Sequence, residues 1–236
     1  MAHVNILTVL KRWTVPHLKF FHEGRQPIVW LLSPLVGVAT GVAAILFRLA
    51  IGVFQLPWLH DMSENVAAVA RAQPWWVILL APAVGGLLVG LILQYLLTAK
   101  RAGAVPDVIE ARASDGRGLG LGQGLLSALA SALSLGCGAS AGREGPIVHL
   151  GASIAASACA HLKLPHAARR TLLASGVAGA VAASFNAPIA GVLFAQEVIL
   201  GRFAASRFVP LVLASVTATI VSQAWFGNVA AFIVPP

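Results

Sequence analysis

Apolar runs long enough to cross a lipid bilayer constrain this chain more than any other feature of its sequence. Residues 75–97 form the clearest run, which has no charged side chain and opens with the pair Trp75–Trp76. Such a pair is a usual anchor at the membrane interface. Residues 28–56 and 208–226 form two further runs. Because a helical span needs about 20 predominantly apolar residues, the sequence predicts an all-α integral membrane protein.

The composition and the placement of charge support the same class. Of the 236 residues, 58% are hydrophobic and 10% are charged, whereas soluble domains carry about 25% charged residues. The net charge is +8, but the basic residues stand in short connectors and form no stripe, so nucleic-acid binding is not expected. The positive-inside rule then predicts a cytoplasmic N-terminal segment at 1–27 and a membrane domain at 28–236. We expect the inner membrane of a bacterial cell as its location.

The remaining apolar stretches are too short or too interrupted for an ordinary helix bundle. Residues 146–162 are short for a full crossing, and the run at 171–196 is broken near its middle by Asn186, Ala187 and Pro188. Breaks at membrane depth free backbone groups that lipid cannot satisfy, so they occur only inside protein or along a cavity. Broken helices of this kind are typical of an ion or substrate site near the bilayer midplane.

The sharpest local motif is the loop Gly142-Arg143-Glu144-Gly145-Pro146, which leads into an apolar helix. The unpaired amides and the dipole of a helix N-terminus attract an anion, and glycine lets the backbone approach it closely. An ionised Glu144 would occupy the anion position itself, whereas a protonated Glu144 would leave it. One side chain would then gate an anion path and carry a proton. The plain alternative is that Glu144 caps the helix while Arg143 extends toward the interface.

Two further loops have the same character but carry less information alone. Residues 101–107 place small residues before Pro106, at an expected helix start. The break at Asn186 and Pro188 also reads as a simple turn between two tightly packed helices. Loops of either composition are usually only turns.

Together these segments resemble the CLC family of chloride channels and proton-coupled anion transporters. The resemblance rests on GREGPIVHLG at 142–151, on the segment 171–197 with its FNAPIAG break, on AGAVPDVIEA at 102–111, and on the closing 226–235. It implies short, tilted and partly re-entrant helices built from two inverted repeats. It also implies a homodimer in which each subunit has its own anion pore, with the helices around 187–200 and 208–226 contributing to the dimer interface.

The resemblance assigns roles residue by residue. Glu144 would be the gating glutamate, and Gly142, Pro146, Pro106, Asn186 and Pro188 would set the helix starts and breaks. The backbone amides near the outer anion position would belong to Arg143, Gly145, Ile147 and Val148. The inner part of the anion path would be the loop of Gly103, Ala104 and Val105. Chloride or a similar small anion would be the ligand, with no other cofactor.

Three departures from the family pattern matter. Gly103 stands where family members often carry a serine hydroxyl, which puts the halide preference in doubt. Val198 stands where the exchangers carry an internal glutamate, so Glu197 is the remaining candidate for a proton path, although we expect it to point into helix packing. Finally, nothing in the sequence resembles the second repeat, so the chain is expected to be an N-terminal half that works as a fragment or with a second CLC-like half.

Other classes of function find little support. His149 and His161 have no Cys, Asp or Glu at ligand spacing, so no metal site is expected. Cys137 and Cys159 make neither a disulfide framework nor a metal pattern. Residues 138–142 match the short pattern GxSxG, but Ser131, Ser134 and Ser140 have no His and acid in a nucleophile arrangement. No phosphate loop ends in GK[ST], so we expect neither an enzyme nor an ATP-driven pump. An anion channel, a proton-coupled exchanger and a non-conducting partner half remain.

Overall fold

The structure is a computed structural model that describes residues 26–62, 66–114, 118–201, 203 and 205–228. Its described residues form helices and contain no strand, so the prediction of an all-α fold is confirmed. The predicted N-terminal segment lies outside the described residues except for its last two. The elements are α2 (Gln26–Leu59), α3 (Val66–Ala70), α4 (Trp75–Tyr95), α5 (Val105–Ala113), α6 (Leu121–Gly136), α7 (Glu144–His161), α8 (His166–Phe185), α9 (Pro188–Phe194), the π-helix η1 (Ala195–Ile199) and α10 (Ala205–Phe226).

Three of these helices are long and apolar enough to span a membrane, and they are the three runs predicted from the sequence. They cover Gln26–Leu59, Trp75–Tyr95 and Arg207–Phe226. The first is 34 residues long, about 50 Å at 1.5 Å per residue, and therefore exceeds the roughly 30 Å of a hydrocarbon core unless it is tilted. The predicted breaks are also present, because α6, α7 and α9 are separate helices of 16, 18 and 7 residues.

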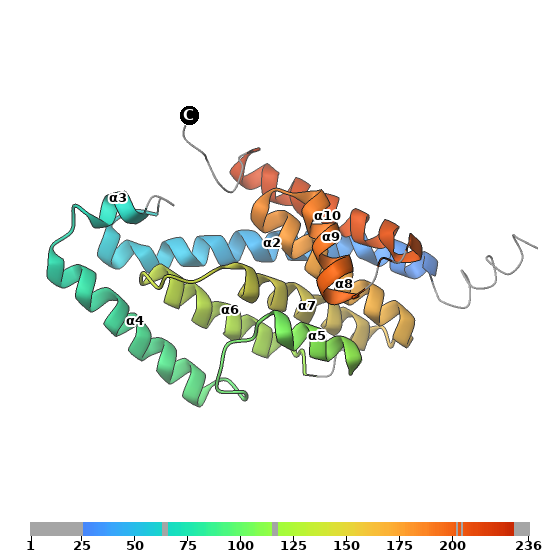
Figure 1. Ribbon diagram of the computed structural model, residues 1–236, viewed down its shortest axis with the longest axis horizontal. Coiled ribbons are helices and arrows are strands. Elements are labelled where there is room, and N and C mark those ends of the chain that lie inside the picture. Colours follow the sequence, from blue (N-terminus) through green and yellow to red (C-terminus); the bar gives the residue numbers. More distant parts are fainter. Residues whose placement is uncertain (1–25, 63–65, 115–117, 202, 204, 229–236) are drawn as a thin grey trace, which may run out of the picture.

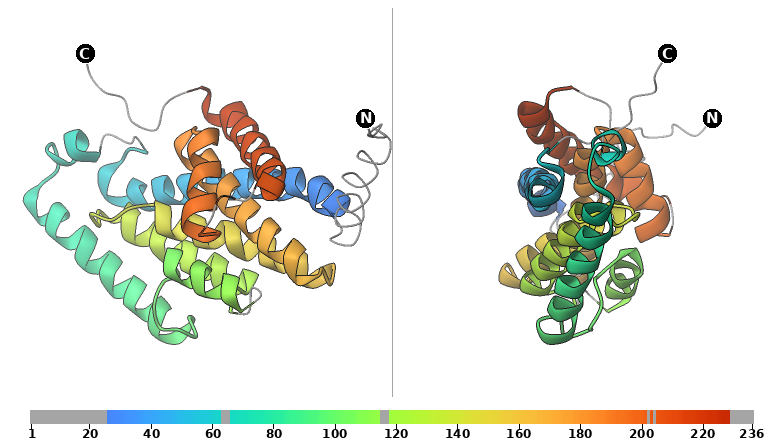
Figure 2. Two further views of the ribbon diagram at one scale, coloured as in Figure 1. Left: turned by 45° about the vertical axis from the view of Figure 1, so that its right-hand side comes forward. Right: turned by 90° about the vertical axis from the view of Figure 1, so that its left-hand side faces the viewer.

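The core is built around α8, in which every residue from Thr171 to Ala183 is buried. Helices α2, α7, α9 and α10 pack around it; α10 lies on one side of α2, and α5, α6 and α7 lie on the other (Figure 1 and Figure 2). Small residues permit this packing. A Cβ atom built on Gly151 of α7 would lie 2.6 Å from the carbonyl oxygen of Gly176 on α8. The two helices therefore cross backbone to backbone, as small residues allow in membrane proteins.

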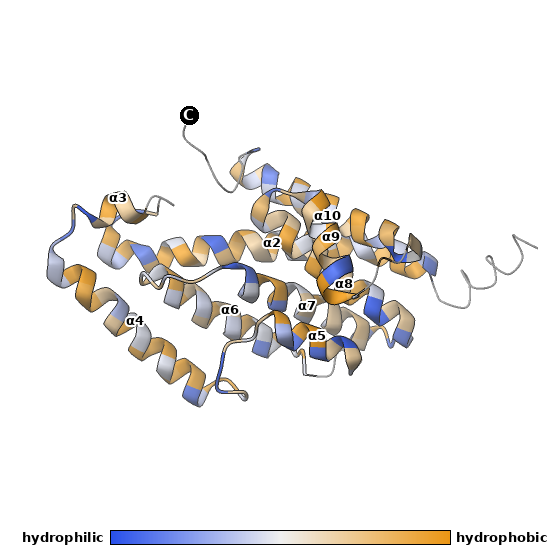
Figure 3. Cartoon of the chain, in the orientation of Figure 1, coloured by the Kyte–Doolittle hydropathy of each residue, from blue (hydrophilic) through white to orange (hydrophobic). Residues whose placement is uncertain are grey.

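Helix α4 stands away from this core (Figure 1), and most of its apolar side chains are exposed. Gly85 is its one buried residue, at the place where α4 touches Cys137 at the end of α6. Trp75 and Leu87 are 75% and 65% exposed, and the helix is apolar along nearly its whole length (Figure 3). Contact of such an apolar surface with lipid is favourable, whereas its contact with water is not.

Candidate functional site

The Gly-bracketed loop ends where α7 begins, and Glu144 is the first residue of that helix. Arg143 precedes it as the N-cap, and Pro146 is the third helical residue, where its missing N–H leaves no hydrogen bond unmade. The Glu144 side chain is exposed and folds back over Gly142. A Cβ atom at position 142 would overlap Glu144 Oε2 and lie 3.1 Å from Glu144 Cδ. Gly142 is therefore required if the carboxylate is to rest against the loop.

The second motif places its loop at the start of α5. The Gly103 N–H donates to Ser127 Oγ of α6 at 2.6 Å, and the Ala104 N–H donates to Asp107 Oδ2 at 2.7 Å. Arg101 donates twice to the same carboxylate, over 2.9 Å and 2.5 Å. The hydrogen bond from Arg101 lowers the pKa of Asp107 below its ordinary value, against the opposing effect of partial burial. Asp107 thus caps α5 as an ionised carboxylate, with Pro106 in the first turn.

These two loops, which are about 40 residues apart in sequence, meet in the fold. A Cβ atom on Gly145 would lie 3.7 Å from Ala104 Cβ, an ordinary van der Waals contact. One turn further along α7, the ring of His149 lies against Gly103. The starts of α5 and α7 therefore converge, and the positive ends of two helix dipoles face one region.

The third motif lies close to the same region. Asn186 ends α8 in the left-handed conformation, with φ of 54°, which Asn tolerates better than most residues. Its side chain accepts from Gln223 at 2.7 Å and donates to Asn228 at 2.9 Å, which fixes the break to the end of α10. Helix α9 then begins at Pro188. The guanidinium of Arg143 lies 5.9 Å from the centroid of the Phe185 ring, so the break also contacts the Glu144 loop.

Several amides expected to bind an anion are already engaged. Ile147 donates to the Arg143 carbonyl at 3.4 Å, because α7 begins two residues before Pro146. Ile147 and Val148 are both buried. The amides of Gly103 and Ala104 serve Ser127 and Asp107, as described above. Of the assigned positions within the helices, the first-turn amide of Gly145 and the helix-opening amide of Val105 belong to the groups that a helix start leaves without an intrahelical acceptor.

Glu197 lies elsewhere and corrects one expectation. It sits in η1 and is exposed, so the expectation that it points into helix packing is wrong. Its neighbour Val198 instead packs against the core formed by α7, α8 and α9. The π-helix widens the turn by one residue, so consecutive side chains are rotated relative to an ordinary helix. This rotation could not be read from the residue types alone.

Two small cavities flank the converging loops, and their polar residues were not singled out from the sequence as site residues. The larger, of about 210 Å³, is lined at its polar side by Thr98, Arg101, Asp107, Glu110, Gln123, Ser127 and His149. The other, of about 150 Å³, contains Ser131 and Ser134 of α6 beside Gly142 and Pro146. His149 follows directly on the Glu144 motif, but its neighbours in sequence have no metal-ligand spacing that would mark it as a site residue. No local signal pointed to Ser127, because its partner Gly103 is 24 residues away.

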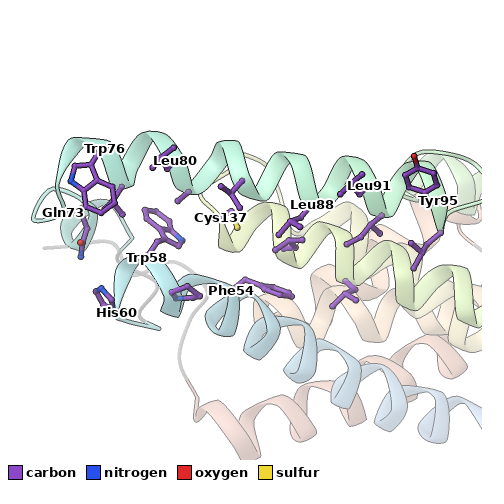
Figure 4. A pocket seen from close by; sticks show the side chains of 18 residues that line it. Phe54, Trp58, His60, Gln73, Trp76, Leu80, Leu88, Leu91, Tyr95 and Cys137 are labelled. Carbon is purple, nitrogen blue, oxygen red and sulfur yellow. The ribbon is translucent and has the colours of Figure 1, made fainter.

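A third, apolar cavity of about 890 Å³ lies apart from these loops, between α4 and the ends of α2 and α6 (Figure 4). Trp58, Trp76 and Gln73 stand at one end of it and Tyr95 at the other (Figure 4). None of the assigned site residues lines it. As for metals, the described residues contain no group of three or more His, Cys, Asp or Glu side chains that could hold an ion.

The chain matches known proteins along most of its length. The family model of the voltage-gated chloride channels matches residues 85–236. A ClcB-like chloride channel protein of Ralstonia nicotianae is 38% identical over 211 residues, which are 86% of this chain and 48% of that protein. The voltage-gated ClC-type chloride channel ClcB of Escherichia coli O139:H28 is 35% identical over 198 residues, which are 82% of this chain and 46% of that protein.

Two solved structures share the fold. A slow cyanobacterial Cl⁻/H⁺ antiporter has a TM-score of 0.64 and 26% identity, and the match covers 83% of this chain and 46% of that one. A CLC-type fluoride/proton antiporter has a TM-score of 0.67 and 25% identity, with 89% and 50% covered. The chain spans about half the length of the curated relatives it matches. From the family match and the agreement in fold, the chain belongs to the voltage-gated chloride channel family, the CLC family.

Proposed function

We propose that the protein forms part of a pathway for chloride or a similar small anion across a membrane, gated by protonation of Glu144. The observation that carries the proposal is the contact between Gly145 and Ala104, which brings the N-termini of α5 and α7 together beside Glu144. Two positive dipole ends and a glycine-rich backbone favour a negative charge there. The names of the relatives, chloride channels and anion/proton antiporters, support a transport role over an enzymatic one.

In this gate the Glu144 carboxylate and a free anion would compete for the same position at the start of α7. When Glu144 is ionised, its carboxylate occupies the positive region at the start of α7 and excludes a free anion. When Glu144 is protonated, that attraction is lost and the side chain is free to swing outward, because it is exposed and rests against Gly142, which has no side chain. The backbone amides at the two helix starts then serve the anion.

The chain spans about half of its relatives, and this supports a second half as a partner. A dehydrated anion needs donors on all sides, and leaving it short of them costs several kcal/mol at low dielectric. We propose that the remaining donors come from a second CLC-like half, and that the assembly is a homodimer or a pair of such halves. The runner-up is a non-conducting fragment or partner half, which the same half-length coverage favours.

Proton coupling is a second candidate, favoured by the two antiporter neighbours. Glu197 is the acidic residue nearest the position where an internal proton acceptor is expected, and its exposure leaves it free to exchange protons with water. Val198, which packs against the core, offers no such group. We further propose the inner membrane of a bacterial cell, with the N-terminus in the cytoplasm.

The test is anion efflux from liposomes that contain the purified chain, with chloride, fluoride and nitrate compared. Glu144→Gln is a fixed neutral mimic of the protonated gate, so it is expected to raise flux at neutral pH and to remove the gate's own acid response. Asp61→Asn removes an acidic charge from the connector after α2 and is the matched control, with flux expected to stay at the wild-type level. Flux that is unchanged by Glu144→Gln removes Glu144 from the gate. If the folded and inserted protein gives no flux, the chain is instead a non-conducting partner half.

A further inference from the structure

His149 is a buried titratable residue that the gate described above does not use. It is 6% exposed on α7, and its Nδ1 atom has no hydrogen-bond partner in the described part of the chain. The ring fills the space beside Gly103, where a Cβ atom would lie 2.5 Å from its Cδ2 and Cε1 atoms. A buried ring nitrogen without a partner is uncommon and calls for a ligand or a switching role.

The ring lines the cavity of about 210 Å³ between the α5 loop, α6 and α7. A water molecule takes up about 30 Å³ in the liquid, so this cavity has room for a small anion with several waters. The uncharged donors around it are Gln123 and Ser127 of α6, and Thr98 from the loop after α4. The space therefore has room for a ligand and carries several hydrogen-bonding side chains in its lining.

The charges around the cavity set the condition for binding. The charges of Arg101 and Asp107 cancel, because the two side chains form an ion pair. Glu110 then gives the cavity lining a net charge of one negative unit while His149 is neutral. Helix α8, which packs against α7, carries Arg169 and Arg170 near its start, whereas its residues 171–185 and the whole of α6 contain no charged side chain. An anion would thus be repelled by the cavity when His149 is neutral. Protonation of His149 cancels the excess negative charge and makes both ring nitrogens N–H donors.

We propose that His149 is an anion-binding residue of the inner loop, and that its cavity takes up a small monovalent anion such as chloride only when the imidazole is protonated. The inference rests on the proposed function and adds a second acid-dependent position, separate from the Glu144 gate. The two positions lie five residues apart on α7. Because Gly103 has no side chain, the ring itself is the group that faces the α5 loop at this point.

The experiment follows the protonation of the His149 imidazole directly by NMR. The chain is labelled with ¹⁵N-histidine in detergent micelles, and the imidazole signals are titrated between pH 5 and 8 in sodium chloride or sodium gluconate of equal ionic strength. Gluconate is too large for the site. If chloride binds the protonated form about tenfold more tightly, linkage raises the His149 midpoint by about one pH unit in chloride. His161 is the internal control, since it lies on the same helix, is exposed and contacts its own Ser157 carbonyl.

The variants separate this site from the gate. His149→Gln and His161→Gln assign the two signals by their loss. Glu110→Gln keeps His149 and removes the excess negative charge, so it is expected to strengthen the chloride effect on the His149 midpoint even if His149→Gln does not fold. Equal His149 midpoints in chloride and gluconate, or equal shifts at His149 and His161, overturn the proposal.

Flux distinguishes failure of this site from failure of the proposed function. In a Glu144→Gln background the acid activation that remains is expected to come from His149 and to disappear on adding His149→Gln. A chloride-dependent His149 shift without any flux supports the site and contradicts conduction by this chain. Gated flux without the shift supports the proposed function and overturns the site.

Discussion

The close crossing of α7 and α8 gives the sharpest test of the fold that positions Glu144. In Gly176→Ala the added Cβ atom would overlap the Gly151 carbonyl oxygen and lie 2.9 Å from Ala155 Cβ. The latter distance is about 1 Å short of a normal contact between carbon atoms. The obstacle is largely backbone, so no rotamer change relieves it and the two helices must move apart.

A matched control on α4, Gly90→Ala, separates the energetic cost of the clash in Gly176→Ala from the effect of adding a methyl group to a helix. Overpacking of this kind costs about 1–3 kcal/mol, whereas Ala in place of Gly in a helix interior is favourable by about 0.5–1 kcal/mol. Gly90→Ala brings the same favourable term without the clash, because nothing lies within 4 Å of its Cβ position. The difference between the two variants thus isolates the clash at about 1–3 kcal/mol.

Thermal unfolding in detergent, followed by far-ultraviolet circular dichroism, measures this difference. For chains of 150–250 residues 1 kcal/mol shifts Tm by about 2–4 °C, so the two variants are expected to differ by roughly 2–12 °C. Gly176→Ala should unfold below wild type and Gly90→Ala at or above it. If Gly176→Ala is as stable as Gly90→Ala, the backbone contact between Gly151 and Gly176 does not exist and the placement of α7 is wrong.

Three further predictions concern single residues. Because the pKa of Asp107 is lowered in the folded protein, the ionised cap stabilises the fold at pH values above the ordinary carboxyl pKa, and this stabilisation is lost as pH falls through the folded pKa. The free energy of unfolding of Asp107→Asn should therefore change less with pH in the acid range than that of wild type. An unaltered pH profile would contradict the pairing with Arg101. Val198→Glu alone is not expected to install proton exchange, because the rest of a proton path is missing; proton uptake driven by a chloride gradient in liposomes would show otherwise. Trp58→Phe removes the indole N–H that donates to Gly136 O at 2.7 Å and should lower the free energy of unfolding by about 0.5–1.5 kcal/mol, measured by denaturant titration, with a neutral result excluding that bond.

Much of the fold was readable from local rules. The three spanning helices follow from runs of apolar residues, and their observed ends lie within three residues of the predicted ones. The starts of α5, α7 and α9 follow from proline and glycine positions, which act on the backbone within one turn. The short helix α3 was not predicted, because its five residues give no periodic signal.

The candidate site divides in the same way. The sequence by itself determined that Glu144 opens a helix after a glycine, and that Gly103 leaves a place without a side chain. Only the tertiary structure decided that His149, 46 positions later, fills that place, and that Ser127 takes the Gly103 amide. The exposure of Glu197 was likewise decided by the π-helix and by what packs beside it. Hydropathy and backbone preference act between residues a few positions apart, whereas these contacts depend on how closely α5, α6, α7 and α8 approach one another, which their small residues permit but do not specify.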